Sequence, residues 1–530
     1  MTFIPTFHSK LNVAQLEDSE TGMTVSTILP DNSKETSSIL AYIGARFSRS
    51  SKSLLELAKE SRSRGNEAER LEKIFSGYGH RSVGDQARLI VSLENIPDLE
   101  AMYILYRLPH YAAQQRSTRY QDFSNDKIPF SLDEIETDQR KESLSRYYKE
   151  AINTYKNAYE PVYNSLRERF KEADEKTLHS RTLDCTRNLL PVGIPTNLII
   201  YTDARTISEL ISILMAGGNN RKLIGSLLYN LLTGNCHKND ETSPLVERLK
   251  DFFNKSYKPE AKRLIRHTEP NLIQNKFINH LISFVDDLAL YKENLKNQEV
   301  RLSEPFFGLD ISTCELLKRG LALKDYYATY PPNGRLYYDL KAHLTKLFAY
   351  LRQFNDKSQL GNIGQVGAIN FEGIADLGSL RDLNRHRSTE RFFPLLEDEY
   401  ISFTDIPYSI EIKNSEYLLA NPERKTYSFN YDLRHPLMRL INNAVRFEVT
   451  NESNLKERKM ARYLLPLGYP TRYFIGMSLT DLIYIASLRT KAGGHIAYRR
   501  LVSNWAKTYQ NNNPYLKDAI NYHSIDPEKD

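Results

Sequence analysis

R-N-L-L-P-V-G-I-P-T occupies residues 187–196, and R-Y-L-L-P-L-G-Y-P-T occupies residues 462–471. The two decapeptides begin 275 residues apart, and seven of their ten positions are identical. A second pair of related motifs lies upstream at nearly the same separation: R-L-P-H-Y-A-A-Q-Q-R-S-T-R-Y at 107–120 and R-H-R-S-T-E-R-F-F at 385–393. Two landmarks in the same order and at the same spacing indicate gene duplication, so we expect two copies of one domain.

The chain is too long, at 530 residues, for one ordinary core. We predict a first repeat at 1–244, a helical connector at 245–296 and a second repeat with a polar C-terminal tail at 297–530. Strand-like runs at 88–93 and 368–371 precede the arginine-rich motifs, and helical runs follow both decapeptides. Because strands and long helices are mixed without a regular β-α-β alternation, the predicted fold class is α+β.

Residues 131–170 predict one long helix. Ser131 and Glu134 have the spacing of a capping box, and Pro161 is expected to bend the helix or to split it. Apolar side chains at intervals of three and four predict one face that packs in the core or against a partner helix, namely Leu144, Tyr148, Ile152, Tyr155, Tyr159, Val162 and Leu166.

The composition, with 40% hydrophobic and 26% charged residues, is that of a soluble globular protein. No apolar run reaches the length of a membrane span, and the first residues lack the pattern of a signal peptide, so we expect a cytoplasmic protein. Cys185, Cys236 and Cys314 are widely spaced and odd in number, which argues against a disulfide framework or a zinc site. The net charge of +6 fits an anionic small ligand or weak nucleic-acid affinity and selects neither.

Arg385-His386-Arg387 is a dense cationic cluster. Two guanidiniums beside one imidazole suit an anionic ligand such as a pyrophosphate, because Arg presents a planar fork of donors. The alternative is a solvated basic face or a structural ion-pair cluster, and it is the preferred interpretation when only composition is considered. Ser117, Thr118 and Arg119 place two hydroxyls next to a guanidinium, which is compatible with a monophosphate site but is a weak signal by itself.

Arg489 follows Arg462, the first residue of the second decapeptide, by 27 residues. It ends an apolar helical stretch, and this placement, unusual for a surface charge, predicts an inward-facing role. The same spacing from Arg187 reaches Leu214. One repeat therefore carries the second arginine, whereas the other carries an apolar residue.

Taken in order, these motifs resemble those of the flavin-dependent thymidylate synthases. The order is G-H-x-S-V at 79–83, the R-H-R cluster, S-x-R-Y at 117–120, R-x-x-L-P and then the inward arginine. The resemblance covers most of both repeats. It implies an α+β fold in which FAD and dUMP bind where subunits of a homotetramer meet. For this chain it implies a homodimer of tandem chains, a pseudo-tetramer, with one composite site between the repeats.

In the family, one subunit supplies the R-H-R cluster, the L-P arginine and the activating arginine, and its partner supplies S-x-R-Y. The resemblance makes Arg489 the catalytic residue, which polarises the uracil ring. It implies that dUMP is bound by Gln115, Ser117, Thr118, Arg119, Asp382, Arg385, Arg462 and Arg489. It implies that FAD is bound by Ser82, Gln115, Asp203, Arg205, Arg385, His386 and Arg387. No metal ligand is implied.

The other combination of motifs has decayed. R-H-R has become Arg107-Leu108-Pro109 in the first repeat, and Leu395 occupies the position of the motif serine in the second. This complementary loss indicates selection for a single working site. Four positions depart from the family pattern of Glu, Asn, Asn and Gln: Gln115, Asp203, Glu209 and Asp382. Added carboxylates near anionic ligands weaken binding unless they pair with arginines.

The preferred hypothesis is an FAD-dependent synthase that converts dUMP into dTMP with methylenetetrahydrofolate and NADPH as co-substrates. One alternative is a non-catalytic descendant that binds flavin or nucleotide, which the extra carboxylates favour. The other is a nucleic-acid binder that uses the arginine clusters and some of the 34 tyrosines, and only the mild positive charge supports it. Neither a membrane partner nor a nucleic-acid partner is expected on the preferred hypothesis.

Overall fold

A computed structural model of the chain describes residues 3–8, 13–28, 37, 41–43, 46, 50–53, 56–57, 81–108, 112–119, 121–124, 127–235, 264–265, 268–270, 300–302, 369–396, 433–450, 454–491, 494–513 and 520–523. The predicted connector at 245–296 lies outside these residues, apart from 264–265 and 268–270. Gly79, His80 and Tyr120 of the predicted motifs also lie outside them.

The α+β fold class is confirmed, because the described residues form helices and two antiparallel sheets. The chain divides into two compact units, and each unit is discontinuous in sequence. Unit 1 contains the described residues of Met1–Lys156, Leu190–Asp287 and Leu440–Leu465. Unit 2 contains those of Asn157–Leu189, Leu288–Arg439 and Pro466–Asp530.

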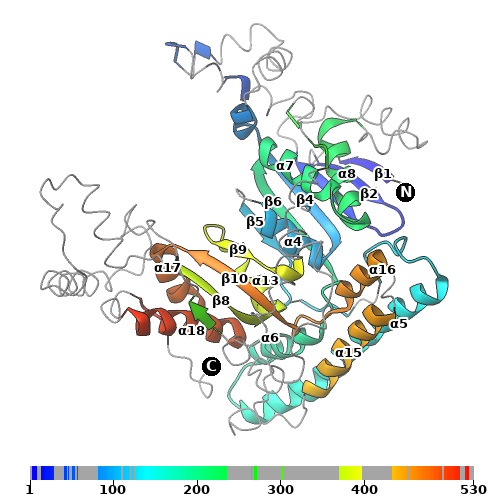
Figure 1. The fold of residues 1–530 in the computed structure, drawn as a ribbon, viewed down its shortest axis with the longest axis vertical. Helices are drawn as coiled ribbons and strands as arrows, with labels where there is room; N and C mark the ends of the chain where they lie inside the picture. The colour runs from blue at the N-terminus through cyan, green and yellow to red at the C-terminus, as the bar shows by residue number, and fades with distance from the viewer. Residues whose placement is uncertain are drawn as a thin grey trace, which may run out of the picture. The chain divides into compact units, whose positions relative to one another are not determined.

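Unit 1 is built on a six-stranded sheet with helices packed on its strands (Figure 1). Alternating burial along β2 and β4 gives the sheet one well-buried face. The strands, in spatial order, are β1 (Phe3–His8), β2 (Val13–Asp18), β3 (Thr24–Ile28), β4 (Arg88–Pro97), β6 (Pro195–Asp203) and β5 (Ala112–Gln115). The helices that pack on them are α4 (Asp98–Arg107), α7 (Ala204–Met215) and α8 (Asn219–Thr233), and the 3₁₀ turn η1 (Arg81–Gln86) packs on α7.

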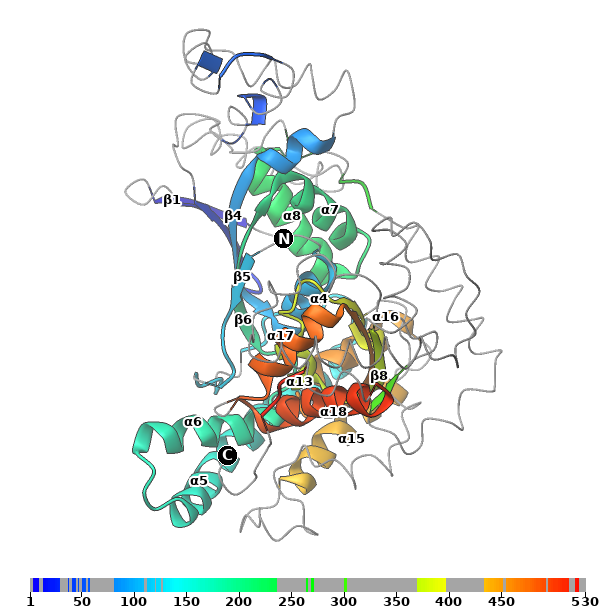
Figure 2. The same cartoon turned by 90° about the vertical axis from the view of Figure 1, so that its left-hand side faces the viewer.

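Unit 2 is built on a four-stranded sheet whose β7 and β8 pack against α18 (Figure 2). Trp505 of α18 is fully buried, stacks on Phe371 and donates its indole N–H to the hydroxyl of Tyr473 at 2.8 Å. The strands, in spatial order, are β7 (Val300–Leu302), β8 (Ile369–Asp376), β10 (Pro470–Met477) and β9 (Glu390–Phe392). The helices are α13 (Leu377–Leu383), α17 (Leu479–Arg489) and α18 (Ile496–Asn512), with the 3₁₀ turn η6 (Pro394–Leu396).

The two units share a common frame. The order β3-β4-β6-β5 in unit 1 corresponds to β7-β8-β10-β9 in unit 2, and a helix follows each of the two central strands. The same backbone bond recurs: the N–H of Leu99 donates to the carbonyl of Val192 at 2.8 Å, and the N–H of Gly378 donates to that of Leu467 at 2.9 Å. This correspondence supports the predicted tandem arrangement of two related domains.

A strand begins within each decapeptide and separates it from the helix that follows. β6 and β10 begin at the second proline of the motif, Pro195 and Pro470, and the helices α7 and α17 follow only after these strands. The helices expected after the decapeptides are therefore present, and each is preceded by a strand. Proline at the first position of a strand is tolerated because the ladder there needs no N–H from it.

The glycine of each decapeptide is required by a close backbone contact. Gly193 donates its N–H to the carbonyl of Tyr463 at 2.9 Å, and Gly468 donates to that of Asn188 at 2.9 Å. A Cβ atom at Gly193 would lie 2.6 Å from the Tyr463 oxygen, and one at Gly468 would lie 3.0 Å from the Asn188 oxygen. A side chain at either position would displace the segment that carries the motif arginine.

The two R-x-L-L-P segments are divided between the units in opposite ways. η2 (Arg187–Leu189), from the first predicted repeat, is part of unit 2, whereas η8 (Ala461–Leu464), from the second, is part of unit 1. The helices before them follow the same division: α6 (Glu175–Thr186) is in unit 2 and α16 (Leu455–Met460) is in unit 1. Each unit therefore contains the motif arginine of the other repeat.

The predicted long helix forms α5 (Asp138–Arg169), which begins seven residues later than predicted and continues through Pro161. Six of the seven residues of its predicted apolar face are buried, and Tyr159 is partly exposed. The predicted capping box does not form. Glu134 accepts the N–H of Asn219 at 2.6 Å, at the start of α8, and the Ser131 hydroxyl accepts the N–H of Asp133.

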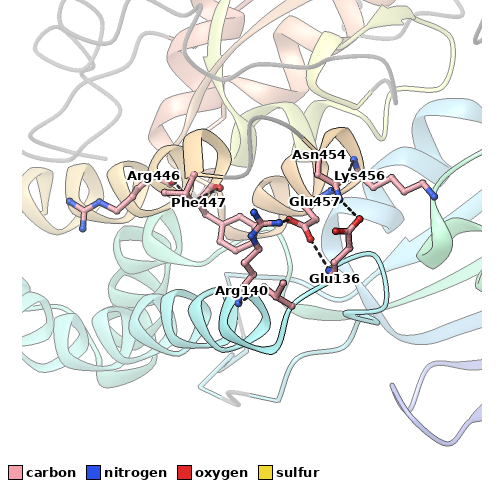
Figure 3. A network of polar contacts seen from close by, with 9 residues as sticks. Glu136, Arg140, Arg446, Phe447, Asn454, Lys456 and Glu457 are labelled. Carbon is pink, nitrogen blue, oxygen red and sulfur yellow. Dashed lines mark hydrogen bonds and ion pairs between the residues drawn. The ribbon is translucent and has the colours of Figure 1, made fainter.

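A buried carboxylate attaches α16 to the start of α5 (Figure 3). Glu457 is fully buried and accepts the N–H of Glu136 at 2.7 Å and an N–H of Arg140 at 2.5 Å. Asn454 caps α16 and donates to the Glu136 carboxylate at 2.9 Å. Because η8 follows α16 directly, this network also fixes the segment that carries Arg462. α15 (Arg434–Thr450) precedes it in the chain.

Candidate functional site

Arg489, the predicted catalytic residue, ends α17. Ser478 caps the start of this helix by accepting the N–H of Asp481 at 3.1 Å, and the helix is buried along most of its length. The guanidinium Nε of Arg489 donates to Nε2 of His386 at 2.6 Å, and Nη2 donates to the main-chain carbonyl of Asp382 at 3.2 Å. The predicted inward orientation of Arg489 is thus explained by two specific acceptors.

The R-H-R cluster lies in the turn between α13 and β9. His386 is buried, whereas Arg385 and Arg387 on either side of it are exposed. The turn is closed by the Ser388 hydroxyl, which donates to the carboxylate of Asp481 at 2.5 Å, and thus ties the turn to the start of α17. One imidazole therefore points inward while two exposed guanidiniums flank it.

Asp382 and Arg187 form a buried ion pair. Nη1 of Arg187 lies 3.0 Å from Oδ2 of Asp382, and Arg187 is fully buried. Burial opposes ionisation of Asp382, but the guanidiniums of Arg187, Arg381 and Arg385 outweigh it and hold the pKa of this carboxyl well below its usual range. Asp382 is therefore a permanent anion inside a group of arginines.

Sequence reasoning missed Arg187. The assignment of Arg462 as the L-P arginine stays a prediction, and the structure shows in addition that Arg187 lies in unit 2 beside Asp382. Arg462 is a buried residue of η8 in unit 1. Both arginines begin the same repeated decapeptide, which was the available signal. The spacing along the chain did not reveal that the segments are divided oppositely between the units.

The Ser117–Arg119 segment follows β5 in unit 1. Thr118 is buried, Ser117 and Arg119 are half-buried, and the Ser117 hydroxyl accepts the N–H of Arg119 at 3.3 Å. Gln115 is buried and donates its amide to the carboxylate of Asp98 at 2.8 Å, which leaves Oε1 without a partner in the described residues. Ser117 and Arg119 are thus the partly exposed polar residues of this short turn, whereas Thr118 is enclosed.

The predicted flavin-binding residues of unit 1 lie around η1 and the start of α7. Ser82 is in η1. Asp203 caps α7 by accepting the N–H of Thr206 at 2.9 Å, so its carboxylate serves the helix. Arg205 is exposed and bonds to Glu209 at 3.1 Å and to Asp85 at 3.4 Å; chiefly the bond to Glu209 raises its pKa.

The structure therefore divides the predicted residues between the two units. The unit 2 cluster comprises Asp382, Arg385, His386, Arg387 and Arg489, to which the structure adds Arg187. The unit 1 group comprises Ser82, Gln115, Ser117, Thr118, Arg119, Asp203, Arg205 and Arg462. The unit 2 cluster has an excess of guanidinium over carboxylate, which is the electrostatic requirement for binding phosphate or pyrophosphate.

Within the described residues, no three His, Cys, Asp or Glu side chains gather as ligands for a metal ion. The same residues include no helix that is both long enough and apolar enough to span a bilayer.

Comparison with known proteins confirms the resemblance over part of the chain. Residues 31–221 match the family described as thymidylate synthase complementing protein. The matched range contains Ser82, the Ser117–Arg119 segment, Arg187 and Arg205, and it ends before the R-H-R cluster.

Two relatives extend over both predicted repeats. A UPF0159 protein of Chlamydia pneumoniae is 23% identical over 476 residues, which is 86% of this chain and 81% of that protein. A UPF0159 protein of Chlamydia muridarum is 23% identical over 479 residues, or 85% and 80% of the two chains. Similarity to these relatives therefore extends well beyond the range of the family match.

Proposed function

We propose that the protein is a flavin-dependent thymidylate synthase that converts dUMP into dTMP, with methylenetetrahydrofolate as carbon donor and NADPH as reductant. The family match over residues 31–221 supports a thymidylate-synthase-like function. The observation that carries the proposal is the fixed guanidinium of Arg489, which is held by His386 and by the carbonyl of Asp382. A cation oriented before the substrate arrives is what stabilises charge that develops on a uracil ring.

The residues present fit an anionic flavin cofactor. Arg385 and Arg387 expose their guanidiniums on either side of the buried His386, and such planar donors match the pyrophosphate of FAD. Ser82 and Arg205 are the further candidates in unit 1, together with Gln115 and Asp203. Bound FAD would supply the hydride chemistry, and the protein would supply binding, orientation and charge.

The candidates for dUMP fall into the same two groups. In unit 2 Arg489 would face the ring and Arg385 would hold the phosphate, with Asp382, paired with the buried Arg187, setting the local charge. In unit 1 the hydroxyls of Ser117 and Thr118 and the guanidinium of Arg119 would contact the phosphate, with Gln115 and Arg462 as further candidates in the same unit. Hydroxyl and guanidinium donors are the usual partners of a phosphate monoester.

Binding is tested by the absorbance spectrum of the purified protein, reconstituted with FAD and then titrated with dUMP. We expect an oxidised-flavin spectrum that dUMP perturbs at about one site per chain. Formation of dTMP is then measured with all co-substrates present. If the protein retains no flavin and dUMP leaves the spectrum unchanged, the proposed enzyme is rejected.

The role of Arg489 is tested by Arg489→Leu. We expect turnover to fall by about 10²–10³-fold, because one preorganised donor to the developing charge is lost, while flavin binding persists. Leu214, buried in α7, occupies the corresponding position in the first repeat, so Leu214→Met is the matched control. It should leave turnover close to that of the unaltered protein. Equal turnover in both variants would contradict the assignment.

A second candidate function is non-catalytic binding of flavin or nucleotide. The Arg187–Asp382 ion pair favours it, because Asp382 neutralises part of the positive charge that a phosphate would use. On this hypothesis FAD and dUMP bind but no dTMP forms, and Arg489→Leu weakens dUMP binding without any turnover to lose.

We also propose that the two repeats are tandem duplicates and that two chains associate as a homodimer. The shared strand order and the repeated backbone bonds support the first statement. The second rests on the resemblance to a tetrameric family. Light scattering of the purified protein measures the mass directly, and a monomer at micromolar concentration would contradict it.

A further inference from the structure

We infer that His386 is a positioning residue for Arg489: its neutral imidazole accepts the Nε–H of Arg489 and sets the plane of the guanidinium. The bond is short, at 2.6 Å, and His386 is 8% exposed. The resemblance assigns His386 only to flavin, whereas its contact in this chain is with the proposed catalytic arginine. The effect on catalysis rests on the proposed function, but the hydrogen bond itself does not.

The protonation state follows from the donor and acceptor roles. A guanidinium only donates, so the imidazole Nε2 must carry a lone pair, and the proton of the neutral ring must lie on Nδ1. The second bond, from Nη2 of Arg489 to the carbonyl of Asp382, fixes the same group from another direction. Among the described residues, Nε2 of His386 and this carbonyl are the two hydrogen-bond acceptors of the Arg489 side chain.

The imidazole is itself held firmly enough to act as a support. The main-chain N–H of His386 donates to the carbonyl of Leu383 at 3.0 Å, and its own carbonyl accepts the Thr389 hydroxyl at 2.7 Å. The ring meets Tyr484 edge to face, with centroids 6.3 Å apart. Tyr484 and Arg489 both belong to α17, so the histidine connects the R-H-R turn to the end of that helix.

The charged and titratable groups around His386 make protonation of the ring disruptive. α17 contributes Arg489 and Tyr484, and the histidine's own turn contributes Arg385 and Arg387. α13 contributes Asp382, through its carbonyl to Arg489, and α18 contributes Tyr498, whose ring centre lies 5.6 Å from Cζ of Arg489. An imidazolium would lose its acceptor and would face a guanidinium of like charge. The positioning bond is therefore present at high pH and lost as the ring gains a proton.

Three variants test the inference in the full-length protein. His386→Gln keeps a neutral acceptor at every pH, His386→Leu removes the acceptor, and His435→Gln removes an exposed histidine of α15 as a control. We expect His386→Leu to lower kcat by about 10²-fold, the size of effect that a misplaced catalytic group produces. His386→Gln should recover most of that loss and should abolish the acid limb of the kcat–pH profile, whereas His435→Gln should leave the profile unchanged.

Two results would overturn the inference: unchanged kcat in His386→Leu, or an acid limb that persists unaltered in His386→Gln. If the unaltered protein shows no turnover, the proposed function fails separately, and ¹⁵N-histidine NMR of the protein alone decides the inference. The His386 resonance, assigned by its loss in His386→Gln, should then show the Nδ1–H tautomer and should shift in Arg489→Leu. An Nε2–H tautomer, or no shift, would contradict it.

Discussion

Units 1 and 2 share a backbone frame but differ in the side chains placed on it. Where unit 2 has Arg489 at the end of α17, the corresponding position in unit 1 is Leu214, fully buried in α7. Where the first repeat has the half-buried Ser117, the second has Leu395, buried in η6. At both positions the apolar side chain is part of a core, so the two units keep the same backbone frame with different side chains at these places.

The comparison also shows what both units have kept. Gly193 and Gly468 make equivalent close backbone contacts, and each draws in the R-x-L-L-P segment of the other repeat. A buried arginine accompanies each contact, Arg187 in unit 2 and Arg462 in unit 1. The backbone around the two glycines therefore has the same close contact in both units, whereas the side chains near Arg187 and Arg462 differ.

The largest expected effect comes from removing the arginine that unit 2 takes from the first repeat. Arg187→Met leaves the Asp382 carboxylate without its closest partner, and breaking a buried pair in this way costs about 3–5 kcal/mol of folding free energy. Urea unfolding at pH 7 measures the change. Arg462→Met is the matched variant in unit 1 and is measured in the same way.

The double variant Arg187→Met/Asp382→Leu distinguishes the cost of leaving one charge unpaired from a general loss of folding stability. Removing both charges should restore most of the lost stability, because no isolated carboxylate then remains. The pair also has a defined pH window: a carboxyl whose pKa is depressed on folding contributes fully above its unfolded value of about 3.9, and the contribution falls as the pH drops below it. Additive single effects would show that the two side chains are not coupled.

The sequence could predict the fold class, the α5 helix and the inward orientation of Arg489, because each depends on local pattern or on a charge at the end of an apolar helix. It could not predict that Arg187 would lie with Asp382, since the exchange of the R-x-L-L-P segments depends on long-range packing. The capping box at Ser131 and Glu134 failed for a related reason. Glu134 satisfies the start of α8, a partner distant in sequence.

In unit 1, Tyr463 occupies the position in the R-x-L-L-P segment that Asn188 occupies in unit 2. The Tyr463 hydroxyl donates to Glu100 at 2.5 Å, and Arg221 binds the same carboxylate at 2.8 Å. Tyr463→Phe removes a hydrogen bond to a buried charge and should cost about 1.5–3 kcal/mol, measured by thermal or urea unfolding. FAD binding should persist, because this network lies apart in sequence from the R-H-R turn.

The same variant predicts a difference at high pH. Burial, followed by the charge of Glu100, raises the pKa of Tyr463 well above its usual value. Above about pH 10 the unfolded tyrosine therefore loses its proton first, and the stability of the protein falls as the pH rises. Tyr463→Phe has no such proton, so the stability gap between the two proteins should narrow in alkali. A stability difference that stays constant with pH would mean that Tyr463 has the same pKa in the folded and unfolded states.

The smallest effect compares the caps of the two helices that lead into the R-x-L-L-P segments. Asn454 caps α16 by accepting the N–H of Lys456 at 3.1 Å, and Asp174 caps α6 by accepting that of Thr177 at 2.9 Å. Asn454→Ala should cost about 1 kcal/mol, seen as faster amide exchange in α16 at any pH.

The cap of α6 should instead weaken in acid. The hydrogen bond from the N–H of Thr177 is the main cause that holds the pKa of Asp174 below its usual value. Protonation of Asp174 removes the negative charge that favours this bond, so the cap is weaker at low pH. Equal exchange of the α6 amides at acidic and neutral pH, after correction for the intrinsic rate, would mean that the Asp174 carboxylate does not stabilise this helix. The caps of α6 and α16 would then both be independent of charge.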